Sequence, residues 1–157
     1  FDGNDFAGAT HLLLRARAQP VGTLRLRWFA DFAKLERVAI RADHRGGRAA
    51  RVLIAAAFDL AARKGYRRMI GHAQERLVPF WKQYRAHVRD HRPRFVFSDH
   101  EYVEIEAELA SPANALGADA DPIVLLRPEG DWDRPGVLDN SATRPASNPH
   151  KRRRCVN

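Results

Sequence analysis

The sequence predicts an α/β fold in which a mixed, mostly antiparallel sheet with one parallel strand pair is flanked by helices. Residues 24–28 alternate apolar side chains with Arg, and this two-residue period is typical of a half-buried strand. Residues 47–64 place apolar side chains at helical spacing instead, and Lys64 and Gly65 then supply a terminal cation and the glycine that often ends a helix. A long helix between strand segments is the pattern of an α/β domain.

The strands expected around this helix cover residues 11–17, 21–29, 34–40, 67–72, 94–97 and 102–109. The first two form a hairpin joined through residues 18–20, and the last two form a final antiparallel pair. The strand at 67–72 returns parallel to the strand at 34–40, because the helix between them makes a right-handed crossover. A second helix is expected at residues 77–84, with Pro79 tolerated in its first turn.

Composition indicates one globular domain. The chain has 157 residues, 45% of them hydrophobic, which is enough to bury a core. Residues 1–128 are expected to form this domain. Residues 129–157 are rich in Pro, Gly, Asn and Ser and end in a basic run, so they are expected to form an extended or disordered tail.

The expected location is the cytoplasm, with no membrane contact. The longest apolar stretch, residues 52–62, is far shorter than the ~20 residues that a membrane-spanning helix needs. The first nine residues carry no basic segment of a signal peptide. The single cysteine, Cys155, fits a reducing compartment.

An anion-binding turn is the most informative local feature. Residues 35–53, LERVAIRADHRGGRAARVL, run from an apolar strand through a turn rich in Arg and Gly into the long helix. The first backbone N–H groups of a helix have no intrahelical partner, and the helix dipole is positive there. Gly46 and Gly47 allow close backbone approach, while Arg45, Arg48 and Arg51 add charge. The turn therefore predicts a phosphate-bearing ligand.

The RGGRAA turn, the HAQ strand end at residues 72–74 and the VPFWKQY segment at 78–84 together resemble the GNAT acyltransferase superfamily. The strings LERVAI, HAQ and FSDHEYVEIEAEL look like the branch typified by ElaA. The resemblance covers residues 2–109. It implies an N-acetyltransferase that uses acetyl-CoA as cosubstrate and transfers the acyl group directly to a primary amine of a small molecule or peptide, with no metal.

The resemblance also implies cofactor contacts. Backbone amides of the turn would hold the pyrophosphate of coenzyme A, which involves Arg45, Gly46, Gly47, Arg48, Ala49, Ala50 and Arg51. The strand residues Val38, Ala39 and Ile40 would lie beside the pantetheine, and the Gln74 side chain would contact the cofactor. The two parallel strands are expected to splay after Ile40 and around Gly71. Arg48 stands where the family has a glycine.

Two candidates for proton transfer follow from the family's chemistry. Glu36 is the expected base, because it shares a strand face with Val38 and Ile40 and burial would raise its pKa. Its alternative role is an ion pair with a nearby Arg. The acid is expected at a Tyr of the second helix, but Trp81 takes that place. Tyr84, one turn further along, is the substitute, or else merely packs its ring.

Further departures leave other functions open. The family's Gly-Phe pair is replaced by Arg85 and Ala86. Arg48, Trp81 and the missing N-terminal region motivate one alternative, a catalytically impaired domain that binds acyl-CoA as a sensor or structural ligand. A basic nucleic-acid-binding module is a second, less favoured one. It is motivated by the net charge of +8, which attracts any anion.

The resemblance implies that this chain starts after the family's usual N-terminal strand and helices. An exposed sheet edge would follow, and it favours a homodimer.

Histidines offer the remaining candidates. His87 and His91 are four residues apart, a spacing that permits joint metal binding only in a helix, and four arginines surround them. A metal site is therefore not expected. His72 and His100 are candidates to line an acceptor pocket, or else structural residues.

Overall fold

The computed structural model describes residues 8–117. Its elements are β1 (Ala9–Ala16), β2 (Gln19–Trp28), β3 (Ala33–Ile40), the 3-10 helix η2 (Ala42–His44), α1 (Ala49–Arg63), β4 (Arg68–Gln74), the 3-10 helix η3 (Glu75–Leu77), α2 (Val78–Lys82), β5 (His87–Val88), β6 (Phe95–Phe97) and β7 (His100–Glu108). The predicted tail at residues 129–157 lies outside the described residues.

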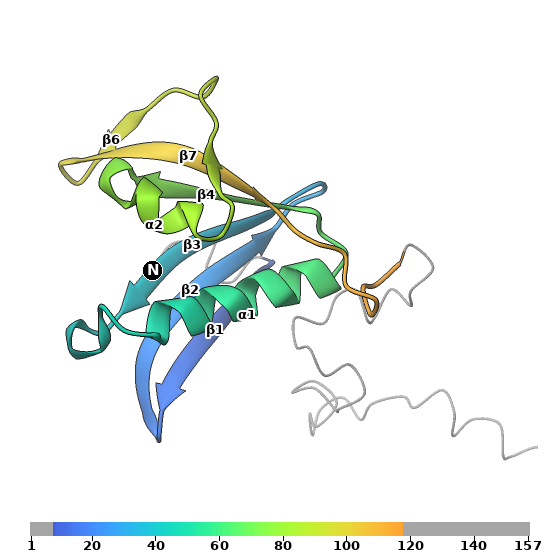
Figure 1. Cartoon of the computed structure of the whole chain (residues 1–157), viewed down its shortest axis with the longest axis horizontal. Coiled ribbons are helices and arrows are strands. Elements are labelled where there is room, and N and C mark those ends of the chain that lie inside the picture. The colour runs from blue at the N-terminus through green and yellow to red at the C-terminus, as the bar shows by residue number, and fades with distance from the viewer. Residues whose placement is uncertain (1–7, 118–157) are drawn as a thin grey trace, which may run out of the picture.

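One mixed sheet organises residues 8–117 (Figure 1). It has seven strands in the order β1-β2-β3-β4-β7-β5, and β6 also pairs with β7. Within this described part, β3 and β4 are parallel and the other pairs are antiparallel. The predicted fold class is therefore confirmed, including the parallel pair on either side of the long helix.

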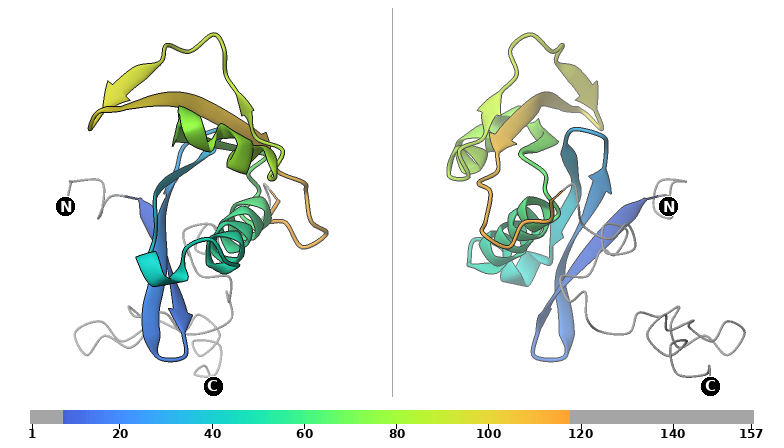
Figure 2. Two further views of the ribbon diagram at one scale, coloured as in Figure 1. Left: turned by 60° about the vertical axis from the view of Figure 1, so that its left-hand side comes forward. Right: turned by 90° about the vertical axis from the view of Figure 1, so that its right-hand side faces the viewer.

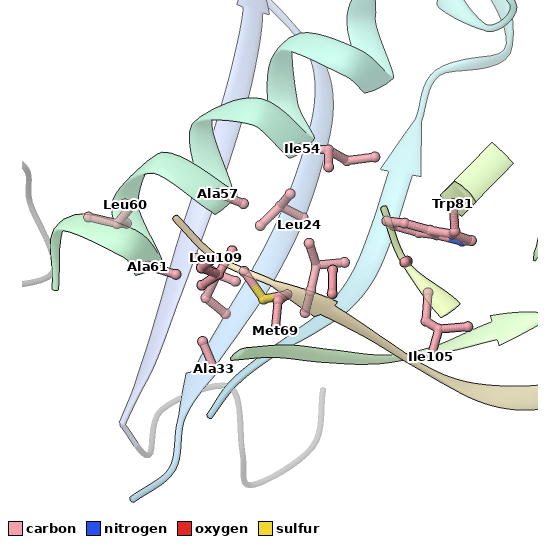
Figure 3. Packing of buried hydrophobic residues seen from close by; sticks show 14 of the residues in the cluster. Leu24, Ala33, Ile54, Ala57, Leu60, Ala61, Met69, Trp81, Ile105 and Leu109 are labelled. Atoms are coloured by element: carbon pink, nitrogen blue, oxygen red, sulfur yellow. The ribbon is translucent and has the colours of Figure 1, made fainter. Parts of the chain in front are cut away.

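Helix α1 covers one face of the first strands, as both views in Figure 2 show. Its buried residues are Leu53, Ile54, Ala57, Leu60, Ala61 and Ala62, a set that recurs at helical spacing. They pack on Leu24 and Leu26 of β2 and on Met69 of β4 in the core cluster (Figure 3). Every described helix is too short or too polar to span a bilayer.

A bulge in β3 changes which side chains face α1. The β2–β3 register shifts between Thr23 and Arg25, and Arg37 opposite the shift has a φ of 52°. A bulge adds one residue and so reverses the alternation beyond it. Leu35 before the bulge and Val38 after it therefore both pack against the core. The prediction that Glu36 shares the face of Val38 and Ile40 is wrong, since Glu36 lies on the opposite face with Arg25.

Several element boundaries differ from expectation, and β5 was not expected. Two of the differences have a clear cause. Gln19 and Pro20 belong to β2 rather than to the hairpin loop, because they pair with Ala16 and Arg15. Helix α2 is shorter than the predicted 77–84. It ends because the Ala86 N–H turns back to the Trp81 carbonyl and the intervening Arg85 takes a left-handed φ of 58°. Arg85 thus adopts a conformation that glycine reaches more easily, at the place where the resemblance leads one to expect glycine.

Candidate functional site

The two parallel strands pair over only three residues and then separate. The partners are Ala33 with Met69, Lys34 with Ile70, and Leu35 with Gly71. The strands approach so closely at the last pair that a Cβ on Gly71 would lie 3.2 Å from the Leu35 carbonyl oxygen. Divergence therefore begins after Leu35, earlier on β3 than the predicted point after Ile40, and around Gly71 as predicted.

The backbone of β3 opens toward this gap. The Arg41 N–H donates to the Val21 carbonyl of β2 at 2.9 Å. Backbone N–H and C=O groups of successive residues in a strand point to alternate sides, so those of Ile40 and Val38 point away from β2. The Ile40 carbonyl accepts a hydrogen bond from Arg45 Nε at 2.9 Å. Backbone groups released from the ladder need other partners, and an extended ligand with amide groups would supply them.

A cavity of about 710 Å³ occupies the gap between the strands. Of the residues predicted for the cofactor and for catalysis, those that line it are Glu36, Val38, Ala39, Ile40, Arg45, Ala50 and Gln74. Gly46, Gly47, Arg48, Ala49 and Arg51 form the adjoining turn and the start of α1 without lining the cavity. The structure thus joins the strand, the helix start and the end of β4 around one space.

The start of α1 offers free backbone donors. Its first intrahelical hydrogen bond runs from the Val52 N–H to the Arg48 carbonyl at 3.0 Å, so the N–H groups before Val52 have no acceptor within the helix. Arg48 provides no side-chain cap, and the first turn contains no acidic residue. Gly46 has a φ of 73°, a left-handed conformation that glycine adopts without strain. Arg48 has a φ of −80°, so the backbone there does not require glycine.

Gln74 lines the cavity, and its side chain carries an unused acceptor. Its Nε2 donates to the Tyr102 hydroxyl at 3.2 Å. Its Oε1 is buried and has no hydrogen-bond partner among the described residues. A buried carbonyl oxygen without a partner is costly, so turning the side chain to bring Oε1 to a ligand N–H would be stabilising.

Glu36 is held by cations on the face of the sheet away from α1. Its Oε2 accepts hydrogen bonds from Arg25 Nε at 3.0 Å and Nη2 at 2.6 Å, and Lys34 Nζ lies 3.1 Å from its Oε1. Burial raises the pKa of Glu36, but the hydrogen bonds and charges of Arg25 and Lys34 outweigh it and lower the pKa below 4.5. The expectation of a raised pKa is therefore wrong, and the ion pair foreseen as the alternative is present. Whether Glu36 acts as the base stays a prediction.

This ion pair makes stability depend on pH. Because the pKa of Glu36 is lower in the folded than in the unfolded state, its carboxylate stabilises the fold above pH 4.5, and this contribution is lost as pH falls through the lowered pKa. We expect Glu36→Gln to lose less stability than the native chain between about pH 6 and pH 3. Urea unfolding at each pH measures the difference. Equal losses would show that the ion pair contributes nothing.

Tyr84 does not line the cavity. Its ring lies 5.9 Å from Phe58 and 5.6 Å from Phe80 between centroids. Its hydroxyl is buried and has no hydrogen-bond partner among the described residues. Burial raises its pKa, and the charge of Arg51 opposes this effect. Trp81 lines the cavity instead, with 9% of its surface exposed.

Replacing Tyr84 with Phe is therefore expected to leave turnover within about 2-fold of the native value, because removing an unpaired buried hydroxyl costs little. The free energy of unfolding should be unchanged or higher by up to about 1 kcal/mol. Steady-state kinetics and urea unfolding measure both quantities. A loss of turnover near 100-fold with unchanged stability would instead establish Tyr84 as the acid.

Histidine pairs form no metal site in the part of the chain that the structure describes. Among residues 8–117, no three His, Cys, Asp or Glu side chains gather closely enough to hold a metal ion. His87 begins the short strand β5, so the helical spacing needed for joint binding with His91 is absent. His72 lines the cavity, whereas His100 does not.

Comparison with known proteins decides the family. The model described as the acetyltransferase (GNAT) family matches residues 3–86. The chain belongs to the GNAT family. The predicted resemblance is thereby confirmed, and the divergent parallel strands belong to a GNAT fold. A comparison with curated proteins gives no match.

Solved GNAT structures share this fold. A protein from Lactobacillus plantarum assigned as an N-acetyltransferase is 25% identical, with 70% of this chain and 75% of that chain covered and a TM-score of 0.62. Escherichia coli ElaA is 16% identical over 68% of this chain and 74% of its own, with a TM-score of 0.61. A GNAT family acetyltransferase from Elizabethkingia anophelis with acetyl-CoA bound is 12% identical over 65% and 77%, with a TM-score of 0.55.

Proposed function

We propose that this GNAT domain transfers an acetyl group from acetyl-CoA to a primary amine by direct attack within a ternary complex. The observation that carries the proposal is the separation of β3 from β4 after Leu35 and Gly71, with a cavity that continues to the start of α1. This arrangement gives an extended thioester ligand one continuous site. The structure of the Elizabethkingia anophelis enzyme holds acetyl-CoA on a similar fold.

The chemistry of the lining fits coenzyme A. The free N–H groups before Val52 suit a pyrophosphate, and Arg48 and Arg51 add positive charge around them. The open edge of β3 and the unpaired Gln74 Oε1 suit the amide groups of pantetheine. When bound, acetyl-CoA would supply an activated acyl carbon. The protein's part is to orient the thioester, exclude water and accept a proton from the amine.

Two measurements test the proposal. Isothermal titration calorimetry with acetyl-CoA tests binding, and release of the CoA thiol with a panel of primary amines tests transfer. Binding together with turnover on at least one amine is expected. No binding would refute the proposal outright.

Binding without turnover would instead favour the catalytically impaired sensor, the alternative suggested by Trp81 in the place of the family's tyrosine. The nucleic-acid alternative rests on net charge alone, and no described feature favours it. It would require binding to DNA or RNA that survives a rise in salt, because attraction to phosphates weakens with salt.

A further inference from the structure

A second group of side chains surrounds the gap on the face turned away from α1. Glu36 and His72 directly follow Leu35 and Gly71, the last paired residues of the two parallel strands. Met69 and Ala73 of β4 are in the core cluster, on the face covered by α1. Side chains alternate along a strand, so His72 faces away from α1. Both Glu36 and His72 line the cavity. An amine that enters from this face would therefore meet a carboxylate and an imidazole at the point of divergence.

A carboxylate on the neighbouring strand holds the His72 ring. Its Nε2 lies 3.4 Å from Glu104 Oε2, on the residue of β7 directly opposite. Glu104 is fixed in turn by Arg89 Nη1 at 2.6 Å and by Arg92 Nε at 3.4 Å. Because Nε2 is turned to Glu104, Nδ1 is the ring nitrogen left for another partner. About a third of the His72 side chain, 35%, is exposed, so a ligand has access to it.

An aromatic surface adjoins His72. The Phe95 ring meets the His72 ring edge to face, with centroids 5.1 Å apart, and stacks on Tyr102 at 5.5 Å. Phe95 and Phe97 alternate on β6, so they share one face, and they are 40% and 64% exposed. Figure 1 shows β6 beside β7, at the end of the sheet away from β1. Exposed aromatic side chains beside a cavity favour an apolar ligand group.

We propose, on the basis of the acyltransfer function above, that His72 is the catalytic base for a primary amine whose aromatic or apolar group lies on Phe95 and Phe97. Glu104 is a positioning residue that orients the ring and stabilises the imidazolium.

His72 suits this role better than Glu36 does. The Glu36 carboxylate is ion-paired with Arg25 and Lys34. A carboxylate stabilised in its charged form is a weak proton acceptor. Imidazole exchanges protons near neutral pH, and Nδ1 of His72 is turned away from its carboxylate partner.

The proposed step conserves atoms and charge. The acceptor ammonium gives one proton to His72 Nδ1, and the imidazolium later releases it to solvent. The lone pair of the amine nitrogen forms a bond to the thioester carbon, and the carbon–sulfur bond breaks with its electron pair on sulfur. The thiolate takes the second proton from nitrogen. The products are the N-acetylated amine and free CoA thiol.

Substitution of His72 tests the base. We expect His72→Ala to lower kcat about 100-fold, with the KM for acetyl-CoA within 2-fold and added imidazole restoring part of the activity. Glu104→Gln should lower kcat about 10-fold without changing either KM. The control is His11→Gln, an exposed histidine of β1 at the opposite end of the sheet, which should leave kcat unchanged. Native kcat in His72→Ala would overturn the assignment, as would a loss that imidazole does not restore.

Substitution of the aromatic surface tests the acceptor class. With 2-phenylethylamine, the double variant Phe95→Ala, Phe97→Ala is expected to raise KM about 10-fold, whereas with ethanolamine KM should change less than 2-fold. Equal effects on the two amines would overturn this part of the inference.

A measurement without turnover separates this inference from the proposed function. In the CoA complex, 2-phenylethylamine should shift the NMR signals of the His72 ring, and His72→Ala should still bind acetyl-CoA with native affinity by calorimetry. If the native chain does not bind acetyl-CoA, the proposed function is refuted. Native acetyl-CoA binding and turnover, with no shift of the His72 signals, would refute only the inference.

Discussion

Replacing Ala50 with Glu is expected to weaken acetyl-CoA binding by at least about 100-fold, because a carboxylate at the cofactor's phosphates introduces like-charge repulsion. Ala50 lies in the first turn of α1 and lines the cavity. The added side chain would also fill space beside the free N–H groups that precede Val52. Isothermal titration calorimetry with acetyl-CoA measures the change.

The matched control is Ala56→Glu, which adds the same side chain to an exposed position of the same helix. It is expected to leave affinity within about 2-fold, since surface charges separated by more than a Debye length are largely screened. Native affinity in Ala50→Glu would place the phosphates elsewhere. A similar loss in both variants would point to the net charge of the chain rather than to a specific site.

Truncating Ile54 to Ala is expected to lower the free energy of unfolding by about 3 kcal/mol, because it removes apolar atoms and leaves a cavity in the core. Ile54 has no exposed surface and ranks among the largest fully buried side chains of the described residues. It lies between α1 and the strands (Figure 3). Urea unfolding monitored by circular dichroism measures the change.

The comparison for this prediction is Val52→Ala on the same helix. Val52 is 51% exposed, so its truncation should change stability by no more than about 0.5 kcal/mol. Losses of similar size in the two variants would mean that α1 does not pack on the sheet through the Ile54 face. A loss below 1 kcal/mol in Ile54→Ala would show that the core collapses around the deletion.

Local sequence patterns were sufficient for the order and type of the main elements. The Leu-Arg alternation of β2 and the helical spacing through Leu53, Ala57 and Leu60 each report which side of an element meets the core, and burial of apolar area drives both. The Gly- and Arg-rich turn before the long helix could also be predicted, because Gly46, the arginines and the start of α1 are contiguous in sequence. The family resemblance added the two diverging strands.

Contacts between distant segments decided the chemistry around the gap. His72 was a candidate from the sequence, but its contacts with Glu104 and Phe95 were not foreseen, because these residues lie far from it in sequence and meet it only through β7 and β6. The alternating acids of residues 104–106 were the available signal, since they mark a polar face of β7. Strand register, which sequence periodicity does not specify, brings these residues together.

The sequence by itself determined the α/β class, the Gly- and Arg-rich turn that leads into α1, and the core-facing side chains of β2 and α1. Tertiary structure alone decided the role open to each candidate. The β3 bulge put Val38 on the face opposite Glu36, which pairs with Arg25, and the packing around α2 left Tyr84 outside the cavity lining. Both outcomes depend on partners distant in sequence, because a carboxylate's or hydroxyl's protonation is set by the charges, donors and burial that surround it in three dimensions.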